Sequence, residues 1–296
     1  MNRSQRATIA KETLKIVDSG KYTSLSGKRV FIRDEVQDCI AGTKLYRPAD
    51  FDDVADQFAK NRPESGFQTK FEVVNATTFA AAHRLTTEAA DVGAENFPNA
   101  GVACLNFASA KNPGGGFLSG SQAQEECLAR ASALYDSINP MQPYYEANRN
   151  CGSSFYTEHM IFSPAVPVFR NDADELIDDP WCTSIITSPS VNRRPLDNRS
   201  PELSKIPGVM RERISNVLMV AAINGCRSIV LGAWGCGVFR NEPQDMANWF
   251  GEHLTQDGLF ADTFENVVFA VLDSTKQERF VTPFKARFDR CRARSA

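Results

Sequence analysis

The fold is decided by the stretch Val102-Ala103-Cys104-Leu105-Asn106-Phe107, which runs directly into a glycine-rich loop at residues 108–123. Such an almost uninterrupted apolar run predicts a strand that is covered on both faces. Four more strands are expected at 159–162, 184–186, 228–231 and 267–272, with helix-length patterns at 204–224 and 242–255. Strands that alternate with helices favour a layered α/β fold, in which ligands bind beyond the carboxyl ends of the strands.

The part of the chain before residue 102 is less informative. An amphipathic helix is expected over 4–18, ended by Ser19-Gly20, and another after Pro48. The second helix would place on one face Phe51, Val54, Ala55 and Phe58. Short strands are expected at 30–32 and 71–74, and a helix at 77–90.

Composition excludes several classes of protein. The chain has 296 residues, 42% of them hydrophobic and 23% charged, as in an ordinary globular protein. A net charge of −3 with no basic block argues against nucleic-acid binding, which rests on basic side chains that displace counterions. No run approaches the ~18 apolar residues of a membrane span, and no signal-peptide pattern opens the chain. We therefore expect a cytoplasmic protein without a membrane partner, although a nuclear location stays open.

Cysteine and histidine usage gives no sign of a metal centre. The eight cysteines contain no C-x-x-C pair and lie mostly in apolar runs, so we expect reduced thiols. The three histidines, His83, His159 and His253, are isolated in sequence, which speaks against a histidine-based metal site. The acidic stretch 172–179 is interpreted as a solvated loop rather than a cation site. We expect no metal and no cofactor.

The loop after residue 107 contains three consecutive glycines, Gly114, Gly115 and Gly116. Without Cβ atoms, their backbone amides can approach a ligand closely. Ser121 and Gln124 fit a capping box, which predicts a helix over 124–137. The first turn of this helix would carry Glu125 and Glu126. The side chains expected to point into the core are those of Cys127, Leu128, Ala131, Leu134 and Tyr135.

A second glycine-rich loop, 232–243, also lies between an expected strand and an expected helix. In that layout, amides near the helix N-terminus can hold a phosphate. The loop lacks the Lys-Ser or Lys-Thr of a P-loop and the third glycine of a dinucleotide fingerprint. Either loop alone is equally explained as a tight turn without a ligand. Two such loops on one sheet favour a phosphate-bearing ligand.

The pair Glu125-Glu126 has two interpretations. Acidic residues are common in the first turn of a helix, where they complement its dipole. Alternatively, one glutamate is a proton donor and base while the other anchors a hydroxyl. Neighbours on a helix point about 100° apart, so they cannot flank one bond like the facing carboxylates of an ordinary glycosidase. The helix N-terminus favours the ionised form, and burial or a substrate phosphate would have to outweigh it.

Together, the motifs resemble one known family. Gly114-Gly115-Gly116, seven residues and then Gln124-Glu125-Glu126 is similar to the signature of poly(ADP-ribose) glycohydrolases, and residues 106–135 resemble their bacterial-type branch. Residues 232–241 resemble the diphosphate loop of that family. The resemblance implies a three-layer αβα, macrodomain-like mixed sheet over residues 71–296. Residues 1–70, which carry no family motif, are interpreted as a helical extension packed on this core within one structural unit.

The resemblance also implies the roles of residues. Glu126 is similar to the catalytic glutamate, which protonates the departing oxygen and then activates water, and Glu125 to the neighbour that positions the ribose. Phe239 resembles the aromatic residue that packs on the distal ribose. The implied substrate-binding set is Gly114, Gly115, Gly116, Gln124, Gly235, Cys236, Gly237, Val238, Phe239, Asn106 and Asn112. Cys236 as a nucleophile is disfavoured, because no histidine is nearby in sequence.

The expected function is therefore hydrolysis of poly(ADP-ribose) from chain ends, by metal-independent general acid–base chemistry in a monomer. Two alternatives remain open. The chain could remove single ADP-ribose groups from proteins or nucleic-acid bases, since acceptor contacts would come from variable loops such as 187–207. It could also be a reader that binds ADP-ribose without turnover, although a reader needs no proton donor.

Overall fold

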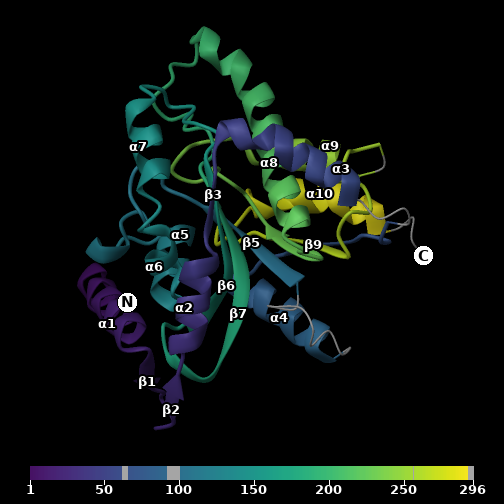
Figure 1. The fold of residues 1–296 in the computed structure, drawn as a ribbon. Coiled ribbons are helices and arrows are strands. Elements are labelled where there is room, and N and C mark those ends of the chain that lie inside the picture. Colours follow the sequence, from purple (N-terminus) through teal and green to yellow (C-terminus); the bar gives the residue numbers. More distant parts are fainter. Residues whose placement is uncertain (62–65, 92–100, 256, 293–296) are drawn as a thin grey trace.

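The computed structural model describes residues 1–61, 66–91, 101–255 and 257–292, and in these residues the centre is a seven-stranded mixed sheet (Figure 1). The strand order is β3-β6-β7-β5-β8-β9-β4. The strands are β3 (Lys44–Tyr46), β4 (Lys70–Val74), β5 (Val102–Phe107), β6 (Met160–Arg170), β7 (Leu176–Ser188), β8 (Ser228–Leu231) and β9 (Asn266–Ala270). From β7 to β4 neighbouring strands are parallel, whereas β6 pairs antiparallel with β3 and β7.

Helices cover both faces of the sheet, which confirms the predicted three-layer αβα fold. One face carries α3 (Phe51–Asn61), α8 (Ile206–Ile223), α9 (Pro243–Leu254) and α10 (Val281–Arg292). The other carries α2 (Arg33–Gly42), α4 (Thr78–Asp91), α5 (Gln124–Ala131), α6 (Leu134–Ile138) and α7 (Gln142–Asn150). The first helix, α1 (Arg3–Ser19), and the small sheet of β1 (Lys21–Thr23) and β2 (Arg29–Phe31) lie beside α5 and α6 (Figure 1).

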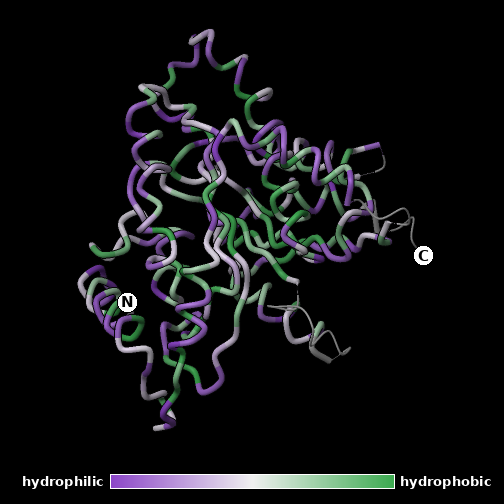
Figure 2. The backbone as a smooth tube through the Cα atoms, viewed as in Figure 1, coloured by the Kyte–Doolittle hydropathy of each residue, from purple (hydrophilic) through white to green (hydrophobic). Residues whose placement is uncertain are grey.

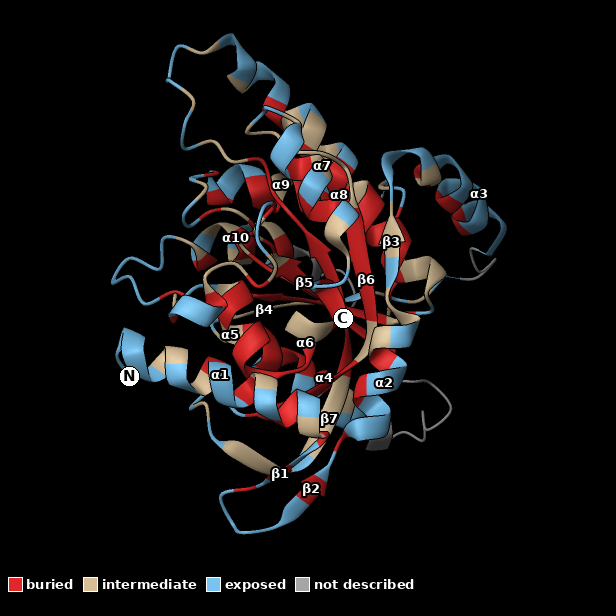
Figure 3. Ribbon diagram, turned by 60° about the vertical axis from the view of Figure 1, so that its left-hand side comes forward, coloured by how far each residue is buried: buried red, intermediate tan, exposed pale blue. Residues whose placement is uncertain are grey.

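The central strand β5 shows why the apolar run is continuous. Ala103 and Leu105 pack in the core that includes α8, whereas Val102 and Cys104 pack in the core that includes α4 and α5. All four side chains are buried. The tube in Figure 2 is accordingly most hydrophobic along the central strands, and Figure 3 shows the strands buried beneath the helices. A strand buried on both faces has no polar alternation, as the sequence predicted.

The expected N-terminal extension is more closely integrated than a set of packed helices. Its strand β3 pairs with β6, with Tyr46 opposite Met160, and so forms one edge of the main sheet. The predicted ending of α1 is confirmed, because Gly20 takes a left-handed conformation with φ of 65°. Ala55 is exposed rather than buried, since α3 turns only Phe51, Val54 and Phe58 inward.

The single helix predicted over 124–137 is wrong. Helix α5 ends at Ala131, and α6 begins at Leu134. Between them Ser132 is extended and bridges Val168 of β6, and the Ala133 amide donates to the Pro167 carbonyl at 3.1 Å. Pairing with a strand far along the chain therefore interrupts the helical pattern. Cys127 and Tyr135, expected to face inward, are only half-buried.

The loops that follow the parallel strands meet at one edge of the sheet, because parallel strands end on the same side. Both glycine-rich loops lie at this edge, after β5 and after β8. The seven cysteines whose side chains are described are free thiols. Within the described residues, no helix is both long and apolar enough to cross a bilayer.

Candidate active site

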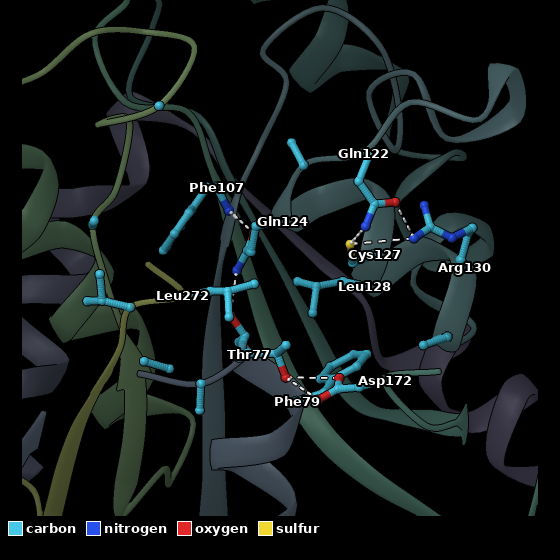
Figure 4. Close-up of a pocket in the computed structure, with 18 of the residues that line it drawn as sticks. Thr77, Phe79, Phe107, Gln122, Gln124, Cys127, Leu128, Arg130, Asp172 and Leu272 are labelled. Atoms are coloured by element: carbon cyan, nitrogen blue, oxygen red, sulfur yellow. Dashed lines mark hydrogen bonds between the residues drawn. The ribbon is translucent and has the colours of Figure 1, made fainter. Parts of the chain in front are cut away.

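Gln124 ties the first turn of α5 to the end of β5. Its Oε1 accepts a hydrogen bond from the Phe107 amide at 2.8 Å, and its Nε2 donates to the Leu105 carbonyl at 2.8 Å and to Thr78 Oγ1 at 3.0 Å. Figure 4 shows this amide against the strand end. The side chain, expected to bind substrate, thus makes its hydrogen bonds to the protein. It sets where the two following glutamates lie.

The Glu126 carboxylate is held by two backbone amides. Oε1 accepts from Gly116 at 2.8 Å, and Oε2 accepts from Ala123 at 2.9 Å. Ala123 is therefore the N-cap residue, and the capping role predicted for Ser121 is wrong. The amide of Gly116 points at this carboxylate rather than at an open ligand site. Within the triple glycine, it is thus the Gly116 amide that holds the Glu126 side chain.

Glycine is required in this loop because the carboxylates lie so close to it. Gly114 and Gly115 have φ of 63° and 59°, in the left-handed region that L-residues rarely adopt. A Cβ on Gly115 would lie 2.6 Å from Glu126 Oε1 and 3.0 Å from Glu125 Oε2. A Cβ on Gly116 would overlap the Ser121 hydroxyl. The three glycines therefore allow the loop to close over both acidic side chains.

Glu125 is a buried carboxyl group with a strongly shifted pKa. Only 3% of the residue is exposed, and its oxygens accept from the Ser109 amide at 2.7 Å and from Asn106 Nδ2 at 3.3 Å. Burial raises the pKa of Glu125 to about 8, and the neighbouring Glu126 acts in the same direction. The Ser109 and Asn106 hydrogen bonds oppose the shift without cancelling it. Burial thus outweighs the helix N-terminus, and Glu125 holds a proton at neutral pH.

Asn106 is placed to respond to that proton. It is fully buried at the end of β5, where Nδ2 donates to Glu125 and to Thr187 Oγ1 at 3.2 Å. Its Oδ1 is buried and has no hydrogen-bond partner among the described residues. A carboxamide turned by 180° would present Oδ1 to a protonated Glu125 and would move Nδ2 into the buried position that now has no partner. Asn112, in contrast, is exposed, and its carbonyl accepts from the Gly115 amide at 3.0 Å.

The raised pKa of Glu125 predicts how stability depends on pH. Between an ordinary pKa of 4.5 and the folded value of about 8, the folded protein holds a proton that the unfolded chain releases. The free energy of unfolding should therefore fall as pH rises through this range. In urea titrations, Glu125→Gln should remove that loss and be more stable than wild type by on the order of 5 kcal/mol at pH 9. This advantage should shrink towards pH 5.

The exposed Glu146 on α7 provides the control for this comparison. Glu146→Gln should follow the wild-type dependence on pH. Parallel curves for wild type and Glu125→Gln would contradict a raised pKa at residue 125.

Contacts with Ser190, Val191 and Asn241 fix the shape of the second glycine-rich loop, whereas three of its backbone amides have no hydrogen-bond partner among the described residues. Gly235 has φ of 73°, and a Cβ there would overlap Ser190 Oγ and Asn241 Nδ2. Asn241 Nδ2 also donates to the Val191 carbonyl at 2.9 Å, which fastens the loop to the segment after β7. Among the described residues, no acceptor faces the amides of Gly235, Gly237 and Val238. Backbone amides without a partner in the protein are suited to binding an anion.

The other predicted residues of this loop differ in their surroundings. Cys236 is buried, and burial raises the pKa of its thiol, so the thiol is protonated and unsuited to be a nucleophile. Phe239 is half-buried, with its ring centroid 6.0 Å from that of Tyr156. Its carbonyl accepts from the Arg193 amide at 3.0 Å, so the loop after β7 supports the aromatic residue.

A cavity of about 450 Å³ connects the two loops. Cys236 and Gly237 line one side, and the segment 122–124 lines the other. Its apolar wall includes Phe79, Phe107, Leu128 and Leu272 (Figure 4). Neither glutamate is among the described residues that line it. A nucleotide that fills the cavity would reach both loops.

Sequence reasoning missed the polar residues at the far end of this cavity. Thr77 Oγ1 donates to both carboxylate oxygens of Asp172 at 2.9 Å (Figure 4). Buried Arg130 pairs with Asp174 at 3.2 Å and donates to Gln122 Oε1 at 2.8 Å. The acidic stretch expected to be a solvated loop thus supplies part of a cavity wall. These residues come from four separate segments: the residue before α4, the loop before α5, α5 itself and the turn between β6 and β7. No local pattern in the sequence indicates that these segments meet.

The fold and the paired glutamates define a member of the microbial-type PARG family, and the chain belongs to it. The family model for the microbial-type PARG catalytic domain matches residues 10–171. The structure is similar to that of poly(ADP-ribose) glycohydrolase from Thermomonospora curvata, with 42% identity and a TM-score of 0.88, covering 97% of this chain and 100% of that one. Comparison with curated proteins gave no match.

Two further solved structures carry ligands. The Thermomonospora curvata enzyme bound to the inhibitor ADP-HPD matches with a TM-score of 0.86 at 42% identity, over 97% of this chain and 100% of that one. The Deinococcus radiodurans enzyme in complex with ADP-ribose matches with a TM-score of 0.78 at 42% identity, over 88% of this chain and 99% of that one. The family membership inferred from the two motifs is confirmed.

Proposed function

We propose that this chain hydrolyses the ribose–ribose bonds of poly(ADP-ribose) from chain ends and releases ADP-ribose. The observation that carries the proposal is the paired carboxyl site, in which the Gly116 and Ala123 amides hold Glu126 beside a buried, protonated Glu125. Family membership and the ADP-ribose complex of a relative support the choice of substrate.

The substrate's diphosphate binds the unpaired amides of Gly235, Gly237 and Val238, and its nucleoside fills the 450 Å³ cavity. Phe239 packs on the distal ribose. Fixing the diphosphate in this way directs the distal ribose and its glycosidic bond towards the glutamates at the end of β5. Such positioning supplies a large part of catalysis, because the reacting groups are already oriented.

Glu126 is the acid and then the base. In the substrate complex it carries a proton, which the water consumed in the preceding turnover supplied, and this proton passes to the oxygen of the departing ribose as the bond to the anomeric carbon breaks through an oxocarbenium-like state. The resulting carboxylate is stabilised by the Gly116 and Ala123 amides and accepts a proton from the water that adds to that carbon. Glu125 donates its proton in a hydrogen bond to a ribose hydroxyl. The substrate's diphosphate supplies negative charge near the cationic centre.

Product analysis tests this proposal. Purified protein incubated with poly(ADP-ribose) should release free ADP-ribose from the start of the reaction. Early accumulation of oligomers would show internal cleavage and contradict the assignment to chain ends. Turnover only of mono-ADP-ribosylated proteins or bases would replace the polymer as substrate. Tight binding of ADP-ribose in calorimetry with no product from any of these would make the chain a reader.

Substitution of Gly237 tests the diphosphate site. No protein atom lies within 4 Å of a Cβ built on Gly237, so Gly237→Ala should fold normally. The added methyl group would enter the space above the unpaired amides. We expect the Kd for ADP-ribose to rise about tenfold, or ~1.4 kcal/mol. Gly208→Ala, equally free of clashes but on α8, should bind like wild type. Unchanged affinity in Gly237→Ala would place the diphosphate elsewhere.

A further inference from the structure

We propose that α1 belongs to the catalytic apparatus, with Arg3 and Arg6 as positioning residues that hold the loop around Glu126. This inference rests on the proposed function, because it assigns a role in the same reaction. Helix α1 lies against α5 on the outer side of that layer in both views (Figures 1 and 3). A chain of hydrogen bonds connects α1 to the Glu126 carboxylate.

Two arginines on α1 bind the turn that follows the triple glycine. This turn is η3 (Phe117–Ser119) and ends at Gly120. Arg3 Nε donates to the Ser119 carbonyl at 2.9 Å, and Arg3 Nη2 donates to the Ser119 hydroxyl at 3.2 Å. Arg6 Nε donates to the Gly120 carbonyl at 2.8 Å. Guanidinium groups thus satisfy successive carbonyls at the end of the turn, and such charged hydrogen bonds are stronger than neutral ones.

The backbones of α1 and the turn are also in direct contact. Gly120 has φ of 74°, and a Cβ there would overlap the Arg3 carbonyl and lie 2.9 Å from the Ala7 amide. Beneath this contact, Ala10 packs with Phe117 and Ala129 in a small buried cluster. The glycine at position 120 is therefore explained by the close approach of α1.

Hydrogen bonds through Gly116 connect the turn to the Glu126 carboxylate. The amides of Ser119 and Ser121 both donate to the Gly116 carbonyl at 3.1 Å. The Gly116 amide donates to Glu126 Oε1 at 2.8 Å. The backbone at Gly116 is thus fixed by the turn through its carbonyl, while its amide orients the carboxylate. If the turn shifts away from α1, the donor that aligns Glu126 shifts with it.

This arrangement predicts a separation between turnover and binding. The contacts of α1 reach the glutamate loop, whereas the unpaired amides proposed to hold the diphosphate lie in the loop after β8. Removing the arginines should therefore slow the reaction while ADP-ribose still binds. Misplacement of a reacting group by about 1 Å can cost up to a hundredfold in rate.

The experiment compares full-length Arg3→Ala, Arg6→Ala and the double variant with Arg33→Ala. Arg33 is the matched control, because its Nη2 also donates to a backbone carbonyl, that of Ser19, at the opposite end of α1. In the double variant, kcat for poly(ADP-ribose) should fall about tenfold, with the Kd for ADP-ribose within about twofold of wild type. Arg6→Lys, which keeps a cationic donor, should recover part of the loss. Arg33→Ala should match wild type in both measurements.

Several results would overturn the role of α1. Wild-type kcat in the double variant would do so, and so would an equal loss of kcat in Arg33→Ala. If the double variant does not fold, Arg3→Ala alone decides, since Arg3 is exposed and its removal leaves the core intact. An inactive wild-type protein would instead refute the proposed function. An active wild type with an unaffected double variant would refute only the positioning role.

Discussion

Glu126→Gln is expected to lower the turnover of poly(ADP-ribose) about a thousandfold while ADP-ribose still binds. General acid–base groups contribute roughly 10²–10⁴ in rate, and a carboxamide cannot deliver the proton. The substitution preserves side-chain shape, and its oxygen can still accept from Gly116 or Ala123. Binding by the loop after β8 should be unaffected. Initial rates of ADP-ribose release and calorimetric Kd values measure the two effects separately.

Glu125→Gln is the informative comparison for this variant. Its carbonyl oxygen can still accept a hydrogen bond from Asn106 Nδ2 or from the Ser109 amide. It should keep a hydrogen bond to the ribose and retain more turnover than Glu126→Gln. The opposite order of activities would exchange the roles of the two glutamates. An active Glu126→Gln enzyme would refute the mechanism.

The parts of the fold that sequence predicted are those with local causes. The buried strand β5 is a continuous apolar run, and the two loops carry their own glycines. The break between α5 and α6 has no such cause, because it arises where Ser132 pairs with Val168. Strand β3 could not be predicted from the sequence for the same reason, because its three residues become a strand by pairing with β6. Long-range pairing overrides local propensity in both cases.

The candidate site likewise has features with local causes, which the sequence predicts, and features that depend on the tertiary fold, which it does not. The glutamate pair and the second loop could be identified from motif and spacing. The direction of the Gly116 amide could not, because it depends on how residues 117–123 fold back towards α5. The cavity wall of Thr77, Arg130 and Asp172 is assembled from three separate elements by the order of the sheet. The raised pKa of Glu125 likewise follows from tertiary burial.

The strongest test of the glycine loop is Gly115→Ala. A methyl group at this position would meet both carboxylates, at 2.6 Å from Glu126 and 3.0 Å from Glu125, in a backbone with φ of 59°. The carboxylates cannot retreat freely, because Gly116, Ala123 and Ser109 already hold them. Turnover should therefore fall about a hundredfold, since both acidic groups are displaced together. Steady-state rates, with circular dichroism to confirm folding, provide the measurement.

Gly152→Ala separates this steric effect from the strain of a left-handed residue. Gly152 has φ of 64°, and a Cβ there would have no neighbour within 4 Å. Both substitutions should cost about 1 kcal/mol or more of unfolding free energy, because an alanine is strained at positive φ. Only Gly115→Ala should also lose turnover. Equal losses in the two variants would mean that backbone strain is the cause, and full activity in Gly115→Ala would show that the carboxylates do not require the close approach of this loop.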